Sequence, residues 1–264
     1  QHRPGAINGI YHLASMAPCP ATWRRPVAMC LLAALHDNAA AGMVAPAAQR
    51  LVLLRHGRTE MNDYLTRVPW DAPHFRDPML IDTRLTDEGR AQAARARELL
   101  CARNDIELVV CSPLTRALHT AELAFAREGG ARPPRTIVCP LAAERRWHGS
   151  DIGRPRPMLE AEFAGAHLDW SLLPPTGSWG YPDVAPASAR AVVDIGITEE
   201  PEVHFVARVA ALHAWLRARP ERTIALVSHW GVIHALTGEQ VENCALLERS
   251  VNELQPGAHM LGDS

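Results

Sequence analysis

Short apolar runs alternate with longer amphipathic ones from Arg50 onward, a pattern that is typical of α/β units. The apolar runs are bounded by polar residues and are rich in Val, Ile and Leu, as expected for strands that are buried on both faces. They comprise residues 51–54, 108–111, 136–139 and 223–227. We therefore predict a mostly parallel sheet.

Three amphipathic segments between these strands predict helices. The first covers residues 87–103, with Thr86 as its N-cap and acidic residues in its first turn. The second opens at Ser112 and Pro113, because serine is a common N-cap and proline is favoured at the first helical position. The third covers residues 202–219. This alternation predicts the α/β class, with helices flanking the sheet.

Two stretches rich in Pro, Gly and aromatic residues interrupt the pattern, namely residues 61–83 and 149–187. We predict long loops or insertions there. Loops of this length within a compact domain are commonly lids or binding walls rather than simple connections. The choice of substrate is expected to depend on them.

The first 48 residues differ in composition from the rest. They are rich in Ala and Pro, contain arginines, and have no acidic residue before Asp37. This composition fits a poorly ordered tail or an organellar transit segment. We predict a tail over residues 1–48 and one domain over residues 49–264.

Overall composition argues against polyanionic partners. The 264 residues carry a formal net charge of -2, which gives no basic surface for nucleic acid or an anionic membrane. The longest apolar run, residues 27–35, is far shorter than the roughly 20 residues of a membrane-spanning helix. Six scattered cysteines without a C-x-x-C pair favour free thiols in a reducing compartment. We expect a cytoplasmic protein, or a plastid or mitochondrial one if residues 1–48 are a transit segment.

The first predicted strand is followed by candidate chemistry, Arg55, His56 and Gly57. Ligands bind at the carboxyl ends of strands in open α/β sheets. An arginine fork matches phosphate oxygens, a neutral imidazole is available as a nucleophile near pH 7, and glycine lets the backbone approach a ligand closely. By its own chemistry, His56 also fits a general base, a metal ligand or an ordinary turn residue.

Two further candidate cations follow other predicted strands. Arg116 lies in the first turn of the helix that opens at Ser112, and His229 follows the last strand. Since the carboxyl ends of parallel strands converge at one edge of a sheet, we expect both to surround a small dianion together with Arg55 and His56. The helix N-terminus at Ser112 is expected to add its dipole.

Four segments resemble, in the right order, the motifs of one family. They read R-H-G-R-T-E-M-N (55–62), R-L-T-D-E-G-R-A-Q-A (84–93), S-P-L-T-R-A-L-H-T-A (112–121) and S-H-W-G (228–231). By this combination the chain is identified as a member of the histidine phosphatase (phosphoglycerate-mutase-like) superfamily, over roughly residues 50–240. The resemblance implies a three-layer α/β sandwich with a mostly parallel central sheet.

The resemblance also implies a phosphomonoester hydrolase that needs no metal or other cofactor. His56 would attack phosphorus, and water would then hydrolyse the phosphohistidine. Arg55, Arg116 and His229 are assigned to the phosphate pocket, where they would stabilise the transferred group. The expected substrate is a phosphorylated small molecule or protein that the sequence does not identify.

Two more residues are assigned by the same resemblance. Glu144 resembles the proton donor of the family, with one residue more between Leu and Glu than is usual. Asp151 lies nearby, and the arginines after Glu144 also permit a simple surface ion pair. Asn62 matches the end of the first motif, so it is expected either to bind phosphate or to begin the long loop.

Two other functions are weighed against hydrolysis. Phosphoglycerate mutases carry a Gly-Trp-x-Asp segment after the R-H-G motif, which residues 64–80 do not match. A degenerate module that only binds phosphorylated ligands is disfavoured by the intact His56 and the paired arginines. The absence of an H-E-x-x-H motif and of a compact His/Asp cluster argues against a metallohydrolase. Hydrolysis is therefore preferred.

The resemblance extends to a narrower group. Residues 77–82 and 151–155 look like a plant, algal and fungal branch of phosphoglycerate-mutase-like proteins. The oligomeric state is not predicted.

Overall fold

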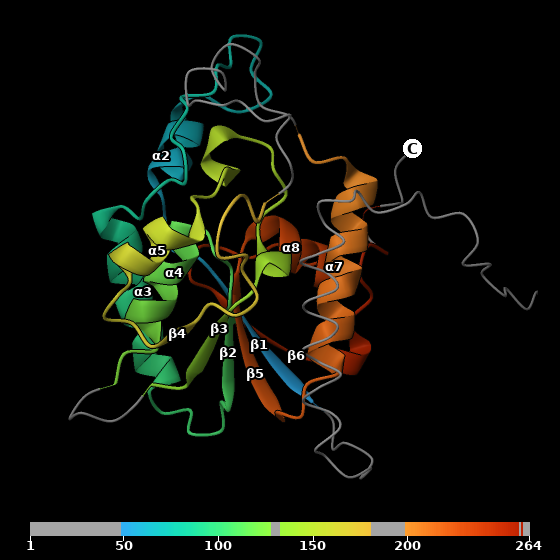
Figure 1. The fold of residues 1–264 in the computed structure, drawn as a ribbon. Coiled ribbons are helices and arrows are strands. Elements are labelled where there is room, and N and C mark those ends of the chain that lie inside the picture. Colours follow the sequence, from blue (N-terminus) through green and yellow to red (C-terminus); the bar gives the residue numbers. More distant parts are fainter. Residues whose placement is uncertain (1–48, 128–132, 181–198, 259, 261–264) are drawn as a thin grey trace, which may run out of the picture.

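A six-stranded sheet runs through the part of the chain that this computed structural model describes, residues 49–127, 133–180, 199–258 and 260 (Figure 1). The predicted tail over residues 1–48 lies outside the described residues. The strands are β1 (Arg50–Arg55), β2 (Leu108–Cys111), β3 (Arg135–Val138), β4 (Leu168–Asp169), β5 (Thr223–Ser228) and β6 (Leu246–Ser250). The four predicted apolar runs coincide with β1, β2, β3 and β5 to within one residue at each end.

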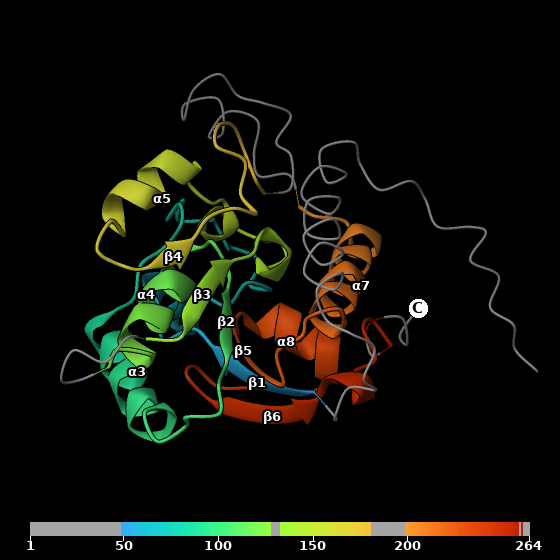
Figure 2. The same ribbon diagram turned by 60° about the horizontal axis from the view of Figure 1, so that its bottom comes forward.

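The strands follow the order β4-β3-β2-β5-β1-β6 across the sheet, as Figure 2 shows. All neighbouring pairs are parallel except β1 with β6, which are antiparallel. The prediction of a mostly parallel sheet is therefore confirmed. The sequence does not reveal the two edge strands, because β4 has two residues and β6 ends in three polar ones.

Helices cover both faces of the sheet. They are α3 (Asp87–Leu100), α4 (Thr115–Ala124) and α5 (Arg156–Glu162) on one face, and α7 (Glu202–Arg217) and α8 (Trp230–Thr237) on the other (Figure 1). The three-layer α/β architecture is thus confirmed. No helix in the described ranges has the length and apolar character that crossing a membrane requires.

Strand β1 shows how the layers are held together. Leu51 and Leu53 belong to the core beneath α7 and α8, whereas Val52 and Leu54 belong to the core beneath α3 and α4. This alternation follows from the pleat of a strand that is buried on both faces. Burial of each of these side chains contributes about 1.5–3 kcal/mol. The strand that precedes His56 is therefore fixed from both sides.

A short helix, α2 (Glu60–Arg67), corrects the prediction of a loop over residues 61–83. Thr59 and Asn62 form a capping box in which each side chain accepts a hydrogen bond from the backbone N–H of the other at 3.1 Å. Met61 is the only residue of α2 that is buried, so no apolar periodicity marks the helix. The second predicted loop, 149–187, likewise contains α5 and β4, and its residues 181–187 lie outside the described part.

Helix α4 begins two residues later than predicted, with Leu114 rather than Ser112 as its N-cap and Thr115 rather than Pro113 as its first residue. Asp82 caps this end, since its Oδ1 accepts from the Thr115 N–H at 2.8 Å and its Oδ2 from the Thr115 hydroxyl at 2.5 Å. Arg154 donates to the same carboxylate at 2.9 Å. The N-terminus of α4 was expected to contribute its dipole to phosphate binding. In the structure, the buried Asp82 carboxylate occupies that end of the helix instead.

Candidate active site

His56 is buried directly after β1, and its hydrogen bond fixes the tautomer of the ring. Its Nδ1 lies 2.7 Å from the carbonyl oxygen of Gly57, and because a carbonyl only accepts, Nδ1 carries the proton. Burial, and then the charges of Arg116 and Arg55, hold the pKa of His56 well below its usual range. The ring is therefore neutral near pH 7, with an unprotonated Nε2.

Close packing of the backbone positions the loop that carries His56. The Gly57 N–H donates to the Thr120 hydroxyl of α4 at 3.0 Å. A Cβ on Gly57 would lie 2.5 Å from the carbonyl oxygen of Gly89 in α3, which explains the glycine. The Asn243 side chain donates to the His56 carbonyl at 3.0 Å. Both faces of the loop are thus held.

Arg55, the last residue of β1, carries a buried donor without a partner among the described residues. Its Nη1 donates to the Val241 carbonyl at 2.7 Å, whereas its Nε is buried and makes no hydrogen bond. Burial lowers the pKa of Arg55, while Glu144 and Glu242 oppose that effect. A buried guanidinium N–H of this kind is costly unless it meets an acceptor, so it suits an anion.

Arg116 and His229 contact one another beside His56. The Arg116 Nε donates to the His229 Nδ1 at 3.3 Å, and the rings of His56 and His229 are 5.1 Å apart. Since Nδ1 accepts, His229 donates through Nε2 to the Ser112 hydroxyl at 2.7 Å. Burial and the Arg116 charge hold the pKa of His229 well below its usual range. His229 is therefore neutral, which corrects its description as a cation.

Glu144 completes the group of predicted residues. Its Oε1 accepts from the Arg145 N–H at 2.9 Å and its Oε2 from the Gly231 N–H at 3.1 Å, next to His229. Burial, and then the charge of Asp151, raise the pKa of Glu144. The neighbouring Arg145 pairs with Glu202 at 3.2 Å. The carboxyl group is therefore suited to hold a proton beside the two histidines.

The comparisons with known proteins agree with this geometry. Residues 51–248 match the histidine phosphatase superfamily (branch 1). This chain belongs to that superfamily. The prediction of an enzyme of the histidine phosphatase type is thereby confirmed.

Two curated relatives and one solved structure illustrate the similarity. A glucosyl-3-phosphoglycerate phosphatase of Mycolicibacterium vanbaalenii is 32% identical over 207 residues, which are 75% of this chain and 79% of the relative. A 2,3-bisphosphoglycerate-dependent phosphoglycerate mutase of an Arthrobacter species is 37% identical over 123 residues, 46% and 45% of the two chains. A mycobacterial glucosyl-3-phosphoglycerate phosphatase in complex with VO3 has a TM-score of 0.43 and 26% identity, covering 76% and 92%.

In this histidine phosphatase, a buried ion pair supports the segment that carries Glu144. Arg208 of α7 pairs with Glu200 at 2.6 Å, and their side chains are 3% and 1% exposed. Arg208 also donates to the carbonyl oxygens of Leu141, Ala143 and Glu144. No sequence motif indicated the contacts between Arg208 and these carbonyl groups, because Arg208 lies more than 60 positions away from them in sequence.

Asn62 lies near His56 but is already engaged. Its side-chain oxygen accepts from the Thr59 N–H, and the Asn243 amide lies 3.4 Å from the same oxygen. Asn243 in turn contacts the His56 backbone. The structure therefore shows a role for Asn62 that differs from both expectations, namely capping of α2. Phosphate binding by Asn62 stays a prediction.

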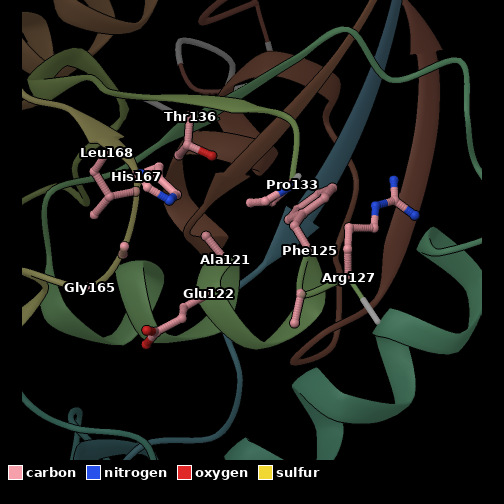
Figure 3. A pocket seen from close by; sticks show the side chains of 11 residues that line it. Ala121, Glu122, Phe125, Arg127, Pro133, Thr136, Gly165, His167 and Leu168 are labelled. Atoms are coloured by element: carbon pink, nitrogen blue, oxygen red, sulfur yellow. The ribbon is translucent and has the colours of Figure 1, made fainter. Parts of the chain in front are cut away.

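A cavity elsewhere in this phosphatase is separate from the predicted residues. It encloses about 300 Å³ between the end of α4 and the start of β3, where Phe125, Thr136 and His167 line it (Figure 3). Arg116 lies at the opposite end of α4, and none of the predicted site residues lines this cavity. Within the described ranges, no cluster of three or more His, Cys, Asp or Glu side chains offers a metal site.

Proposed function

We propose that His56 is the nucleophile of this phosphomonoester hydrolase. The observation that carries the proposal is the unprotonated Nε2 of a neutral, buried ring beside two guanidinium groups. A neutral imidazole attacks phosphorus without first losing a proton, and the arginines hold the oxygens of the transferred group. The free N–H of Arg55 and the remaining N–H groups of Arg116 supply the donors.

The first step transfers the phosphoryl group to the enzyme. The His56 Nε2 forms a bond to phosphorus while the bond from phosphorus to the ester oxygen breaks. Glu144, whose pKa is raised, gives its proton to the leaving oxygen and becomes a carboxylate. His229 acts by holding Arg116 through its Nδ1.

The second step releases phosphate. Water attacks phosphorus, the bond to Nε2 breaks, and the Glu144 carboxylate takes a proton from the water. Inorganic phosphate leaves, and both residues return to their starting states. These steps use only residues of this chain, so we propose that the enzyme does not depend on a metal ion.

For the substrate, we propose a small phosphorylated metabolite of the glycosylated phosphoglycerate class. Support comes from the curated relatives, which are named glucosyl-3-phosphoglycerate phosphatases and match most of the chain. The test is a screen of sugar phosphates, phosphoglycerates and phosphopeptides in excess chelator, with release of inorganic phosphate as the readout. Phosphate movement between the carbons of phosphoglycerate without net release would favour a mutase, and binding without either reaction would favour a degenerate module.

Three predictions concern the whole protein. We propose a boundary near residue 49 between a tail and the phosphatase domain, a cytoplasmic location, and membership of the plant, algal and fungal branch. Limited proteolysis would locate the boundary, microscopy of a tagged full chain would locate the protein, and a phylogeny built on residues 77–82 and 151–155 would test the branch.

The substitution Gly231→Ala is expected to reduce kcat/KM for an alkyl phosphate about 10²-fold, because a Cβ there would lie 2.4 Å from the Glu144 Oε1 and displace the acid. Steady-state kinetics and thermal unfolding check this expectation. Gly165→Ala is the matched control, since a Cβ at that position meets no atom within 4 Å. Wild-type kinetics in the Gly231 variant would show that Glu144 does not need this contact.

A further inference from the structure

We propose that Asp151 is a positioning residue of the phosphatase reaction. Its carboxylate fixes Arg116 at the phosphate site and provides a negative charge beside Glu144. This inference rests on the proposed roles of His56 and Glu144. Asp151 ends the short 3-10 turn Gly149–Asp151, which follows the segment that carries Glu144. The four superfamily motifs do not include it, although it opens the segment 151–155 that resembles a narrower branch.

The two oxygens of Asp151 serve two different parts of the site. The Oδ1 accepts from the Arg116 Nη2 at 2.7 Å, and the two side chains are only 6% and 4% exposed. The Oδ2 accepts from the backbone N–H groups of Trp147 and His148 at 3.2 and 3.1 Å. One carboxylate thus joins Arg116 to the segment that begins at Glu144.

These contacts suit a group that accepts hydrogen bonds on both oxygens. All three partners of Asp151 are donors, so every lone pair in use must accept. An amide at this position would turn an NH₂ group towards a donor on one side or the other. In the turn, Asp151 therefore acts as an acceptor towards all three of its partners.

The turn leaves Arg116 with a defined pair of free donors. Its Nε, Nη1 and Nη2 each give one hydrogen bond, to His229, to the Ser150 carbonyl and to Asp151. A guanidinium has five N–H groups, so one N–H remains on each of Nη1 and Nη2. Two N–H groups on neighbouring nitrogens match two oxygens of a phosphoryl group. The hydrogen bond to Asp151 fixes the orientation of the Arg116 guanidinium group and therefore the direction of these two N–H groups.

The charges around Glu144 connect Asp151 to proton transfer. The charged groups near the Glu144 carboxyl group include Asp151 from the turn, Arg116 from α4 and Arg55 from β1, and Arg208 from α7 donates to the Glu144 carbonyl oxygen at 3.2 Å. Burial is the main cause of the raised pKa of Glu144, Asp151 adds to it, and Arg116 opposes it. Neutralising Asp151 removes one contribution and leaves the charge of Arg116 without its partner. Both changes lower the pKa of Glu144.

The test compares Asp151→Asn with the wild type across pH, using an alkyl phosphate whose leaving oxygen must be protonated. We expect kcat/KM to fall about 10- to 100-fold, as for the loss of a charge-assisted hydrogen bond. We also expect the alkaline limb of the kcat/KM profile to move to lower pH, because a general acid acts only while it is protonated. Asp151→Glu keeps the charge, so its alkaline limb stays with that of the wild type.

Asp77→Asn is the matched control. The Asp77 carboxylate accepts from the Gly149 N–H at 2.9 Å and from the Met79 N–H at 2.7 Å, so it supports the same turn without touching Arg116. We expect its alkaline limb to stay in place. A uniform loss of activity without a shift in Asp151→Asn, or an equal shift in Asp77→Asn, would overturn the proposal.

Two further measurements separate the possible failures. If Asp151→Asn does not fold by circular dichroism, Asp151→Ser provides a second neutral variant, because a hydroxyl both accepts and donates; the same shift of the alkaline limb is expected, and an unshifted limb overturns the proposal. Hydrolysis that persists in His56→Ala would instead refute the phosphohistidine mechanism itself. An unshifted Asp151 variant in an enzyme that depends on His56 refutes only the role of Asp151.

Discussion

Replacement of His56 by alanine is expected to lower kcat/KM about 10⁴-fold or more for every phosphomonoester, because the acceptor of the phosphoryl group is removed. The arginines of the pocket bind phosphate oxygens and cannot replace that bond. Substrate binding, in contrast, should be largely retained, since Arg55 and Arg116 remain.

The measurement is acid- and alkali-quenched turnover of a ³²P-labelled substrate. Phosphohistidine is stable in alkali and labile in acid, so the wild type should yield a protein-bound label with that behaviour, and His56→Ala should yield none. His119→Ala is the control, because His119 lies on α4, the helix that carries Arg116, but contacts Glu162 and Phe163. A labelled His56→Ala protein would mean that another residue is the nucleophile.

Replacement of Glu144 by glutamine is expected to affect substrates according to their leaving groups. General acid catalysis contributes about 10²–10⁴-fold, so hydrolysis of an alkyl phosphate should fall by that factor. p-Nitrophenolate leaves without a proton, so its ester should lose much less. The raised pKa of Glu144 also predicts that wild-type activity on the alkyl ester declines as pH rises through that pKa.

Parallel kinetics of the two esters in Glu144→Gln check this expectation. Glu202→Gln is the matched control, since Glu202 pairs with the adjacent Arg145 but is 41% exposed and does not contact the histidines. Equal losses on both esters would indicate that Glu144 organises the site rather than donating a proton. The alkaline decline should then persist in the variant.

The central part of the fold follows from local sequence signals. Strands β1, β2, β3 and β5 are runs of buried aliphatic residues, and such runs are visible without knowledge of their partners. The convergence of Arg55, His56, Arg116 and His229 follows from parallel topology, because each residue comes after a strand or opens a helix at the same edge.

The remaining contacts depend on residues that meet only in three dimensions. Asp82 caps α4 from 33 positions upstream, and Asn243 reaches His56 from 187 positions downstream. Neither is preceded by a pattern that predicts its partner. The neutral state of His229 could not be predicted from the sequence either. It depends on the burial of the His229 ring and on its contact with Arg116, not on the position of His229 in a motif.

The position of β1 between β5 and β6 has a consequence for synthesis of the protein. A ribosome makes the strand that precedes His56 early, but both strands that pair with it lie beyond residue 222. Until then, both edges of an apolar strand are open, and such edges favour aggregation and chaperone binding. A nascent or prematurely terminated chain can therefore contain the Arg-His-Gly motif and still have no catalytic activity.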